Sequence, residues 1–535
     1  MIDRRRLIAT AAGAPLAAVM SMLESVLDGV AASDAPFDLG PALEQIRRRC
    51  GVPAVGAIAV STDRVLARGV AGFRKMGEPG LVSVDAHWQL GSLTKNFTGT
   101  LAGQLVERGG LSWDATLRQL FPEYLPVMAP NVPDITIRHL MTHHSGMVHP
   151  DPYGWPGGPE INAPGLTLSQ RRQRAVPAAL KGPLLFVPGT RFSYSNRGYN
   201  VLAAVLERLT GRSYEELVVR EIAQPLGLGS IRFGEPALDD PSREPWPHVS
   251  NGSSWKPTQP VPRDQYGYHI ANPVGGLSLT LDQCALWMQA HLRGEQAGGI
   301  VSPATFKLLH TPLEQGGVPP FGVTPAEPLL GRSIWMAGTN LRNFAEYKIL
   351  LDRGAAILSV INANPPDDNP HTFFLMQTAL AFAQPGRPAP ALAPPQPDAA
   401  GNIEGEGLDI AHVGGGEVQF QSFRQLSGRW QLWWTGAKDG QQLLLRLMVP
   451  VTGRYAIDGV FARNRDYGDA TFALRGLRTR LSFRADRLAW ETMPLGETVL
   501  EAGVHELAVT ANGNAGADGI ACHLGLDVLR LRQIS

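Results

Sequence analysis

A serine and a lysine three residues apart begin a long apolar helix pattern, in the segment Gly91-Ser92-Leu93-Thr94-Lys95. Residues three apart share a helix face, so Lys95 can reach the Ser92 hydroxyl. A lysine whose pKa is lowered by burial can take the serine proton and so activate the hydroxyl as a nucleophile. The free N–H groups of a helix N-terminus could hold a developing oxyanion. The structural alternative for this common spacing is a helix residue beside a solvated lysine.

A second group of candidate residues, Tyr194 and Asn196, follows the Pro188-Gly189 turn. Side chains two residues apart in an extended loop can point to the same side. A phenol near a lysine cation loses its proton more easily, so it can act as a general base and later as an acid. The asparagine amide can donate to a substrate carbonyl. The structural alternative is a turn tyrosine with an asparagine that stabilises the loop.

The elements around Ser92 predict a sheet packed against helices. Residues 41–50 are expected to be helical, and residues 54–61 and 65–72 alternate as two strands joined by a three-residue turn. After Ser92, apolar residues recur at every fourth position, which predicts a buried helical stripe that ends at Gly109-Gly110. The stripe consists of Leu93, Phe97, Leu101 and Leu105.

Five segments, in order, resemble signatures of the serine β-lactamase and penicillin-binding protein family, on the side of class C β-lactamases and family VIII esterases. They are residues 91–95 with 106–114, then 135–146, 188–196, 225–228 and 273–277. The resemblance covers roughly residues 38–383. It implies an α/β (α+β) fold, in which an antiparallel sheet is flanked by helices and an all-helical region. It further implies that Ser92 forms an acyl-enzyme, that Lys95 and Tyr194 share the role of general base, and that Asn196 positions the substrate.

Two histidines and two further serines are rival candidates. His143 and His144 invite a Ser–His–acid interpretation, but such a triad depends on mutual orientation, and the family resemblance implies that this segment is structural. Ser145 and Ser195 have no lysine one helical turn away. Ser92 is therefore the expected nucleophile.

The third motif of the family departs from its pattern in this chain. The family has Lys or His, a small residue and then Gly, and the best match is Trp335-Met336-Ala337-Gly338-Thr339-Asn340. A thioether at Met336 carries no charge to recognise a substrate carboxylate. Gly338 still allows close backbone approach, and the Thr339 N–H would complete an oxyanion hole with the Ser92 N–H. We therefore expect an ester or amide substrate without that carboxylate, unless Arg342 supplies the charge.

Composition and the first residues favour an exported protein. The 48 basic and 48 acidic side chains cancel, so there is no global electrostatic case for nucleic acid. Residues 1–35 combine Arg4-Arg5-Arg6, a short apolar run and small-residue cleavage sites, and resemble a twin-arginine export signal. The run is too short for an integral membrane span. We expect a periplasmic or secreted protein. The three cysteines show no metal-ligand spacing, and no cofactor is implied.

The C-terminal quarter of the chain predicts a separate β domain. The expected organisation is an export signal at 1–35, a hydrolase domain at 36–383, a Pro/Ala-rich linker at 384–400 and an accessory β-sandwich at 401–535. The last segment loosely resembles jelly-roll domains of carbohydrate-active enzymes. Trp430, Trp433 and Trp434 could stack on a glycan or simply pack in the core. The expected partner is a small-molecule or peptide substrate. The alternative function is a non-catalytic protein that binds cell-wall or glycan ligands.

Overall fold

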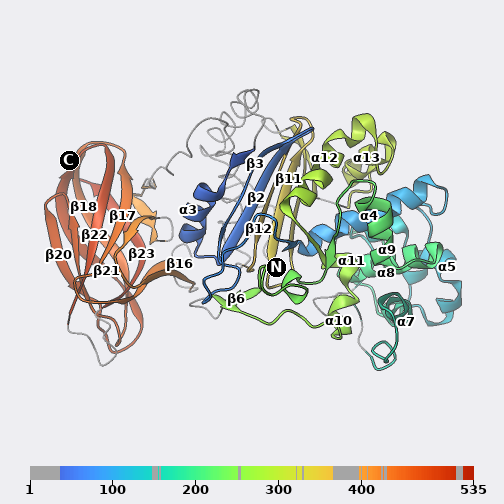
Figure 1. Ribbon diagram of the computed structural model, residues 1–535, viewed down its shortest axis with the longest axis horizontal. Coiled ribbons are helices and arrows are strands. Elements are labelled where there is room, and N and C mark those ends of the chain that lie inside the picture. The colour runs from blue at the N-terminus through green and yellow to red at the C-terminus, as the bar shows by residue number, and fades with distance from the viewer. Residues whose placement is uncertain are drawn as a thin grey trace. The chain divides into compact units, whose positions relative to one another are not determined.

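The computed structural model divides the chain into two compact units, which are described separately (Figure 1). It describes residues 36–147, 155, 158–250, 255–320, 322–327, 331–364, 397–398, 400–405, 408–422, 426, 430–513 and 522–534. The predicted export signal at 1–35 and most of the predicted linker at 384–400 lie outside these residues. The roles assigned to the four segments of the chain stay predictions.

The first unit contains a seven-stranded sheet in the order β1-β3-β2-β12-β11-β10-β9. All neighbours are antiparallel except β1 and β3. The strands are β1 (Phe37–Asp38), β2 (Ala54–Ser61), β3 (Val65–Gly72), β9 (Gly322–Glu327), β10 (Gly331–Thr339), β11 (Phe344–Leu350) and β12 (Ala355–Ile361). The strands predicted at 54–61 and 65–72 are confirmed.

Two central strands are apolar on both faces because both faces are covered. β12 is buried at all seven positions and β2 at seven of eight, which is the pattern of a strand between two layers. Helix α12 (Leu281–Ala297) contacts β2, β11 and β12, and Figure 1 shows it along the sheet.

Several helices of this unit begin at side-chain caps, which fix where those helices start. Thr136, Thr167, Ser195, Thr280 and Ser302 each accept the N–H of a residue in the first turn. The helices are α4 (Thr94–Glu107), α5 (Leu117–Leu120), α6 (Ile137–Met141), α7 (Leu168–Leu180), α8 (Asn196–Thr210), α9 (Tyr214–Val218), α10 (Tyr266–His269), α11 (Asn272–Gly275), α12 and α13 (Pro303–Leu309). Helix α3 (Gly40–Cys50) is divided, because its residues up to Glu44 belong to this unit and the rest to the other. Short strands β4 (Trp88–Gln89), β8 (Leu277–Leu279) and β5 (Arg232–Phe233) form a separate sheet.

The second unit is built from two antiparallel sheets over one apolar core. One sheet has the order β15-β16-β23-β18-β21, with β13 paired to β23, and the other has the order β14-β17-β22-β19-β20. Alternate residues of both sheets enter the shared core, as in a β-sandwich. The strands are β13 (Asn402–Glu404), β14 (Asp409–Val413), β15 (Glu417–Ser422), β16 (Trp430–Ala437), β17 (Gln442–Val449), β18 (Gly453–Arg463), β19 (Asp469–Leu474), β20 (Leu477–Ser482), β21 (Ala489–Leu500), β22 (Gly503–Asn512) and β23 (Cys522–Gln533).

The tryptophans of β16 do not form one exposed platform. Trp434 is fully buried, and its indole N–H donates to the Gly415 carbonyl. Trp433 is half-buried and stacks on His523 at 6.0 Å between ring centroids. The side chain of Trp430 is outside the described residues. Packing therefore accounts for Trp434, and a glycan contact in this unit stays a prediction.

Candidate active site

Ser92 lies in a tight turn that feeds directly into the buried helix α4. The turn is a 3₁₀ helix, η2 (Gly91–Leu93), and α4 follows at Thr94. Gly91 has a φ of 52°, in the left-handed region that glycine adopts without strain. The Thr94 hydroxyl donates to the Gly91 carbonyl at 2.8 Å and fixes the turn. Local sequence thus places Ser92 at the N-terminal end of a core helix.

The Ser92 hydroxyl oxygen accepts hydrogen bonds from two side chains that the sequence predicted to join it. Lys95 Nζ donates to Ser92 Oγ at 2.9 Å, from one turn along the helix. The Tyr194 hydroxyl, from the loop that precedes α8, donates to the same oxygen at 2.7 Å. The structure therefore brings the three predicted catalytic residues together across 102 positions of sequence.

Lys95 is held in a fully buried position that changes its chemistry. Its ammonium also donates to the Val274 carbonyl at 2.7 Å and lies 5.0 Å from the Tyr194 ring centroid. Burial lowers the pKa of Lys95 well below its ordinary value, because water no longer stabilises the charge. A lysine with a lowered pKa can be neutral near pH 7 and accept a proton from the serine.

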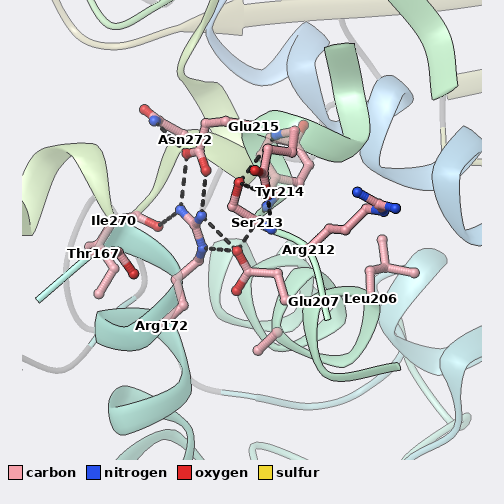
Figure 2. A network of polar contacts seen from close by, with 12 residues as sticks. Thr167, Arg172, Leu206, Glu207, Arg212, Ser213, Tyr214, Glu215, Ile270 and Asn272 are labelled. Carbon is pink, nitrogen blue, oxygen red and sulfur yellow. Dashed lines mark hydrogen bonds and ion pairs between the residues drawn. The ribbon is translucent and has the colours of Figure 1, made fainter. Parts of the chain in front are cut away.

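The carbonyl that holds Lys95 belongs to the short helix α11, which is tethered at several points. The Thr98 hydroxyl donates to the Pro273 carbonyl at 2.7 Å, and the Asn272 amide donates to Glu215 at 2.9 Å. Figure 2 shows Glu215 in turn against the Arg172 guanidinium, with Glu207 on its other side. This chain of contacts links α7, α8 and α9 to the anchor of the lysine.

Arg172 is a fully buried cation shared between two carboxylates. Its Nη2 lies 2.7 Å from Glu207 Oε1 and 2.6 Å from Glu215 Oε2. Burial would lower the pKa of Arg172, but the two carboxylates outweigh it and raise the pKa. Burial would likewise raise the pKa of Glu215, and the ion pair reverses that effect. Figure 2 shows this network, which joins α7, α8 and α9 and reaches α11 through Asn272.

The end of β10 packs backbone to backbone against the Ser92 turn. A Cβ built on Gly338 would lie 2.6 Å from the Ser92 nitrogen, and one on Gly91 would lie 2.6 Å from the Gly338 carbonyl carbon and against the Thr339 nitrogen. Only glycines permit this approach. The geometry brings the end of β10 against the backbone of the Ser92 turn, and an oxyanion site formed by the Ser92 and Thr339 N–H groups stays a prediction.

The position that would carry a cation in the third motif is apolar and enclosed. Met336 is 8% exposed and belongs to the main core of the unit. Arg342 does not replace it, because its guanidinium pairs with the buried Glu235 and donates to the Gln259 carbonyl at 2.8 Å. The suggestion that Arg342 supplies the missing charge therefore fails on its existing contacts.

Other predicted residues have defined places. Asn196 is the first residue of α8, two residues from Tyr194, and its contact with substrate stays a prediction. His143 packs against the Tyr194 ring at 4.4 Å between centroids. Sequence reasoning missed the Val274 carbonyl, which accepts from Lys95, and Tyr199, whose ring centroid lies 5.9 Å from Lys95 Nζ. The 273–277 signature marked the segment of Val274 without indicating its role.

The described part of the chain offers neither a metal-ligand cluster nor a membrane-spanning helix. Within it, no group of three or more His, Cys, Asp or Glu side chains is arranged to hold a metal ion. None of the described helices has the length and apolar character that crossing a bilayer requires.

Comparisons of the sequence with known proteins find a family and several relatives. A family model described as "Beta-lactamase" matches residues 40–370. The esterase EstB of Burkholderia gladioli is 34% identical over 212 residues, which is 37% of this chain and 50% of EstB. Penicillin-binding protein 4 of Amycolatopsis lactamdurans is 28% identical over 261 residues, which is 48% of this chain and 65% of that protein. The chain thus matches about half to two thirds of these relatives.

The fold is also found in solved structures. The octameric penicillin-binding protein homologue from Pyrococcus abyssi superposes with a TM-score of 0.50 and 16% identity, over 86% of this chain and 97% of that chain. Fold and comparisons define a protein with a β-lactamase/transpeptidase-like unit. The chain belongs to the Beta-lactamase family of serine hydrolases.

Proposed function

We propose that this chain is an exported serine hydrolase that acts through an acyl-serine intermediate on esters or amides without a free carboxylate next to the scissile bond. The observation that carries the proposal is the double hydrogen bond to Ser92 Oγ, from Lys95 at 2.9 Å and from Tyr194 at 2.7 Å. When either partner is deprotonated, it can accept the proton of the serine, and this proton transfer activates the nucleophile for acyl transfer.

The proposed reaction has two stages. Ser92 Oγ attacks the substrate carbonyl while its proton passes to the Lys95–Tyr194 pair, and the Ser92 and Thr339 N–H groups stabilise the oxyanion. Collapse of the tetrahedral intermediate breaks the bond to the leaving group, which takes up the proton. Water then attacks the acyl-serine and gives a proton to the same pair. Collapse of this second tetrahedral intermediate breaks the bond to Ser92 Oγ, which takes the proton back from the pair as the acid leaves. Asn196 is assigned to substrate positioning.

The substrate class follows from Met336. A carboxylate in this part of the site would lose its hydration and meet a buried thioether instead of a cation, which is costly. A neutral ester avoids that cost. The similarity to EstB supports an esterase, and the similarity to a penicillin-binding protein keeps amide substrates open.

A pair of substrates that differ only in one free carboxylate tests this specificity. We expect kcat/KM for the neutral ester to equal or exceed that for the carboxylate. Met336→Lys should raise kcat/KM for the carboxylate selectively, with Met336→Leu as the matched control. Strict dependence of the natural enzyme on the carboxylate would contradict the proposal.

Export is supported by the sequence of residues 1–35. N-terminal sequencing of the protein recovered from its native host should give a start near the small residues 30–35. A protein that keeps Met1 would contradict removal of the signal.

A binding protein that has lost turnover is the alternative, and Met336 is the observation that favours it. The Ser92, Lys95 and Tyr194 contacts argue against it. Turnover of a neutral ester that is lost in Ser92→Ala decides between the two.

A further inference from the structure

His143 contacts the segment that carries Tyr194 at three points. Its backbone carbonyl accepts the Ser193 N–H at 2.8 Å, and its Nδ1 accepts the Ser195 N–H at 3.1 Å. Its ring lies 4.4 Å from the Tyr194 ring between centroids, with 33° between the planes. The two hydrogen bonds bracket Tyr194 on either side, and the ring contact restrains the phenol itself.

The backbone at His143 is held in an uncommon conformation. Its φ is 60°, in the left-handed region that residues with a Cβ rarely adopt. The residue directly follows Thr142, at the end of α6, and the next N–H, that of His144, returns to the His139 carbonyl at 2.8 Å. Such conformations persist where the surroundings determine them, and they gather at functional sites. The turn directs the imidazole back toward Tyr194 and Tyr199.

The imidazole is neutral in this position. Nδ1 accepts a hydrogen bond, so it carries no proton. Burial, the Lys95 charge from α4 and the adjacent His144 together lower the pKa of His143 to about 3. The remaining neighbours are aromatic rings, Phe192 at 5.8 Å and Tyr199 at 5.0 Å between centroids. A ring with these restraints is suited to hold a partner in place rather than to exchange protons.

We propose that His143 is a positioning residue that fixes the Tyr194 phenol at hydrogen-bond distance from Ser92 Oγ. The inference rests on the proposed function, because it assigns His143 a role through Tyr194. Tyr194 is 39% exposed, and the contact with His143 is one of the restraints on its ring. Without the hydrogen bonds that the Ser193 and Ser195 N–H groups donate to His143, the phenol can sample orientations that do not reach Ser92.

Rates of hydrolysis of a p-nitrophenyl ester test the role. His143→Leu should lower kcat by about 10- to 100-fold and leave KM nearly unchanged, because a small displacement of a catalytic group affects chemistry more than binding. His143→Asn should recover part of the loss, since asparagine tolerates the left-handed backbone and offers an acceptor near Nδ1. His144→Asn is the matched control and should keep the natural rate.

A double-mutant cycle with Tyr194→Phe separates positioning from general structure. If His143 acts through Tyr194, His143→Asn should cost less than twofold in the Tyr194→Phe background. Equal losses in both backgrounds would overturn the positioning role and leave the proposed function intact. Full activity of Tyr194→Phe itself would overturn both. The Asn variant keeps the test valid if the Leu variant does not fold.

Discussion

The Ser92 hydroxyl oxygen accepts hydrogen bonds from two side chains that differ in their exposure to solvent. Lys95 is fully buried, whereas Tyr194 is 39% exposed at the surface of the site. The buried lysine has a lowered pKa and suits the removal of a proton. In the proposed mechanism the more exposed phenol of Tyr194 returns the proton to the leaving group. The roles that we propose rest on this difference in solvent exposure between Lys95 and Tyr194.

Removal of the lysine charge should separate activity from stability. Lys95→Met keeps the side-chain length and removes a buried amine, so we expect kcat to fall by about 10²- to 10⁴-fold. The thermal midpoint should stay equal or rise, because a buried ammonium costs solvation energy. Ester hydrolysis and thermal unfolding measure the two effects. An active variant, or one that unfolds at clearly lower temperature, would contradict this interpretation.

At the scale of elements, the site depends on the contact between η2 and the end of β10. This contact needs a glycine on each side, at Gly91 and Gly338. The register of β10 with β11, in which Gly338 lies opposite Ala345 and Thr339 opposite Phe344, holds the strand end in place. In the proposed mechanism the sheet therefore supplies one oxyanion donor, the Thr339 N–H, and the helix turn supplies the other, the Ser92 N–H.

Gly338→Ala tests that contact. The added Cβ would lie 2.6 Å from the Ser92 nitrogen, so the strand must move away from the turn. Loss of one oxyanion donor typically costs about 10²- to 10³-fold in kcat. Gly198→Ala is the matched control, because its nearest neighbour is 3.5 Å away. Equal activity of the two variants in ester hydrolysis would contradict the oxyanion assignment.

The Arg172 network should be a major contributor to the stability of the helical region. Arg172→Met leaves Glu207 and Glu215 without a counter-charge, and breaking a buried ion pair in this way typically costs about 3–5 kcal/mol. Chemical denaturation followed by tryptophan fluorescence measures the loss. Arg174→Met, at an exposed position of α7, is the control and should change little. Equal stability of both variants would contradict the role of the network.

At the scale of the whole molecule, buried histidines should make the protein sensitive to acid. Burial lowers the pKa of His143 to about 3 and that of His248 to about 4, from 6.5. Below pH 6.5 the unfolded chain takes up protons that these folded sites exclude, so stability falls as the pH drops toward the lowered pKa values. Each such histidine contributes about 1.4 kcal/mol of lost stability per pH unit.

Thermal midpoints at pH 7 and pH 5 measure that dependence. His248→Gln should reduce the difference between the two midpoints, because one titrating site is removed. His412→Gln, at an exposed position of β14, is the control and should leave the difference unchanged. A natural protein whose midpoint does not change between the two pH values would contradict the prediction.

Much of the fold and the core of the site were accessible from the sequence because both rest on local patterns. The strands at 54–61 and 65–72 alternate, and Ser92 and Lys95 are one helical turn apart. Tyr194 required the family signature, because its contact with Ser92 spans 102 residues. The hydrogen bond from Lys95 to the Val274 carbonyl and the contacts of His143 on either side of Tyr194 were not predictable. They depend on backbone atoms and on a left-handed turn, and residue type indicates neither.

The most direct test of acyl-enzyme formation is the intact mass of the protein after exposure to a fluorophosphonate and, separately, to a penicillin. We expect one fluorophosphonate adduct per chain, mapped to Ser92 and lost in Ser92→Ala, and no penicillin adduct because Met336 offers no cation. A folded protein that takes up no fluorophosphonate, or an adduct that persists in Ser92→Ala, would contradict catalysis by Ser92. A penicillin adduct on Ser92 would be consistent with the mechanism and would contradict the proposed substrate class.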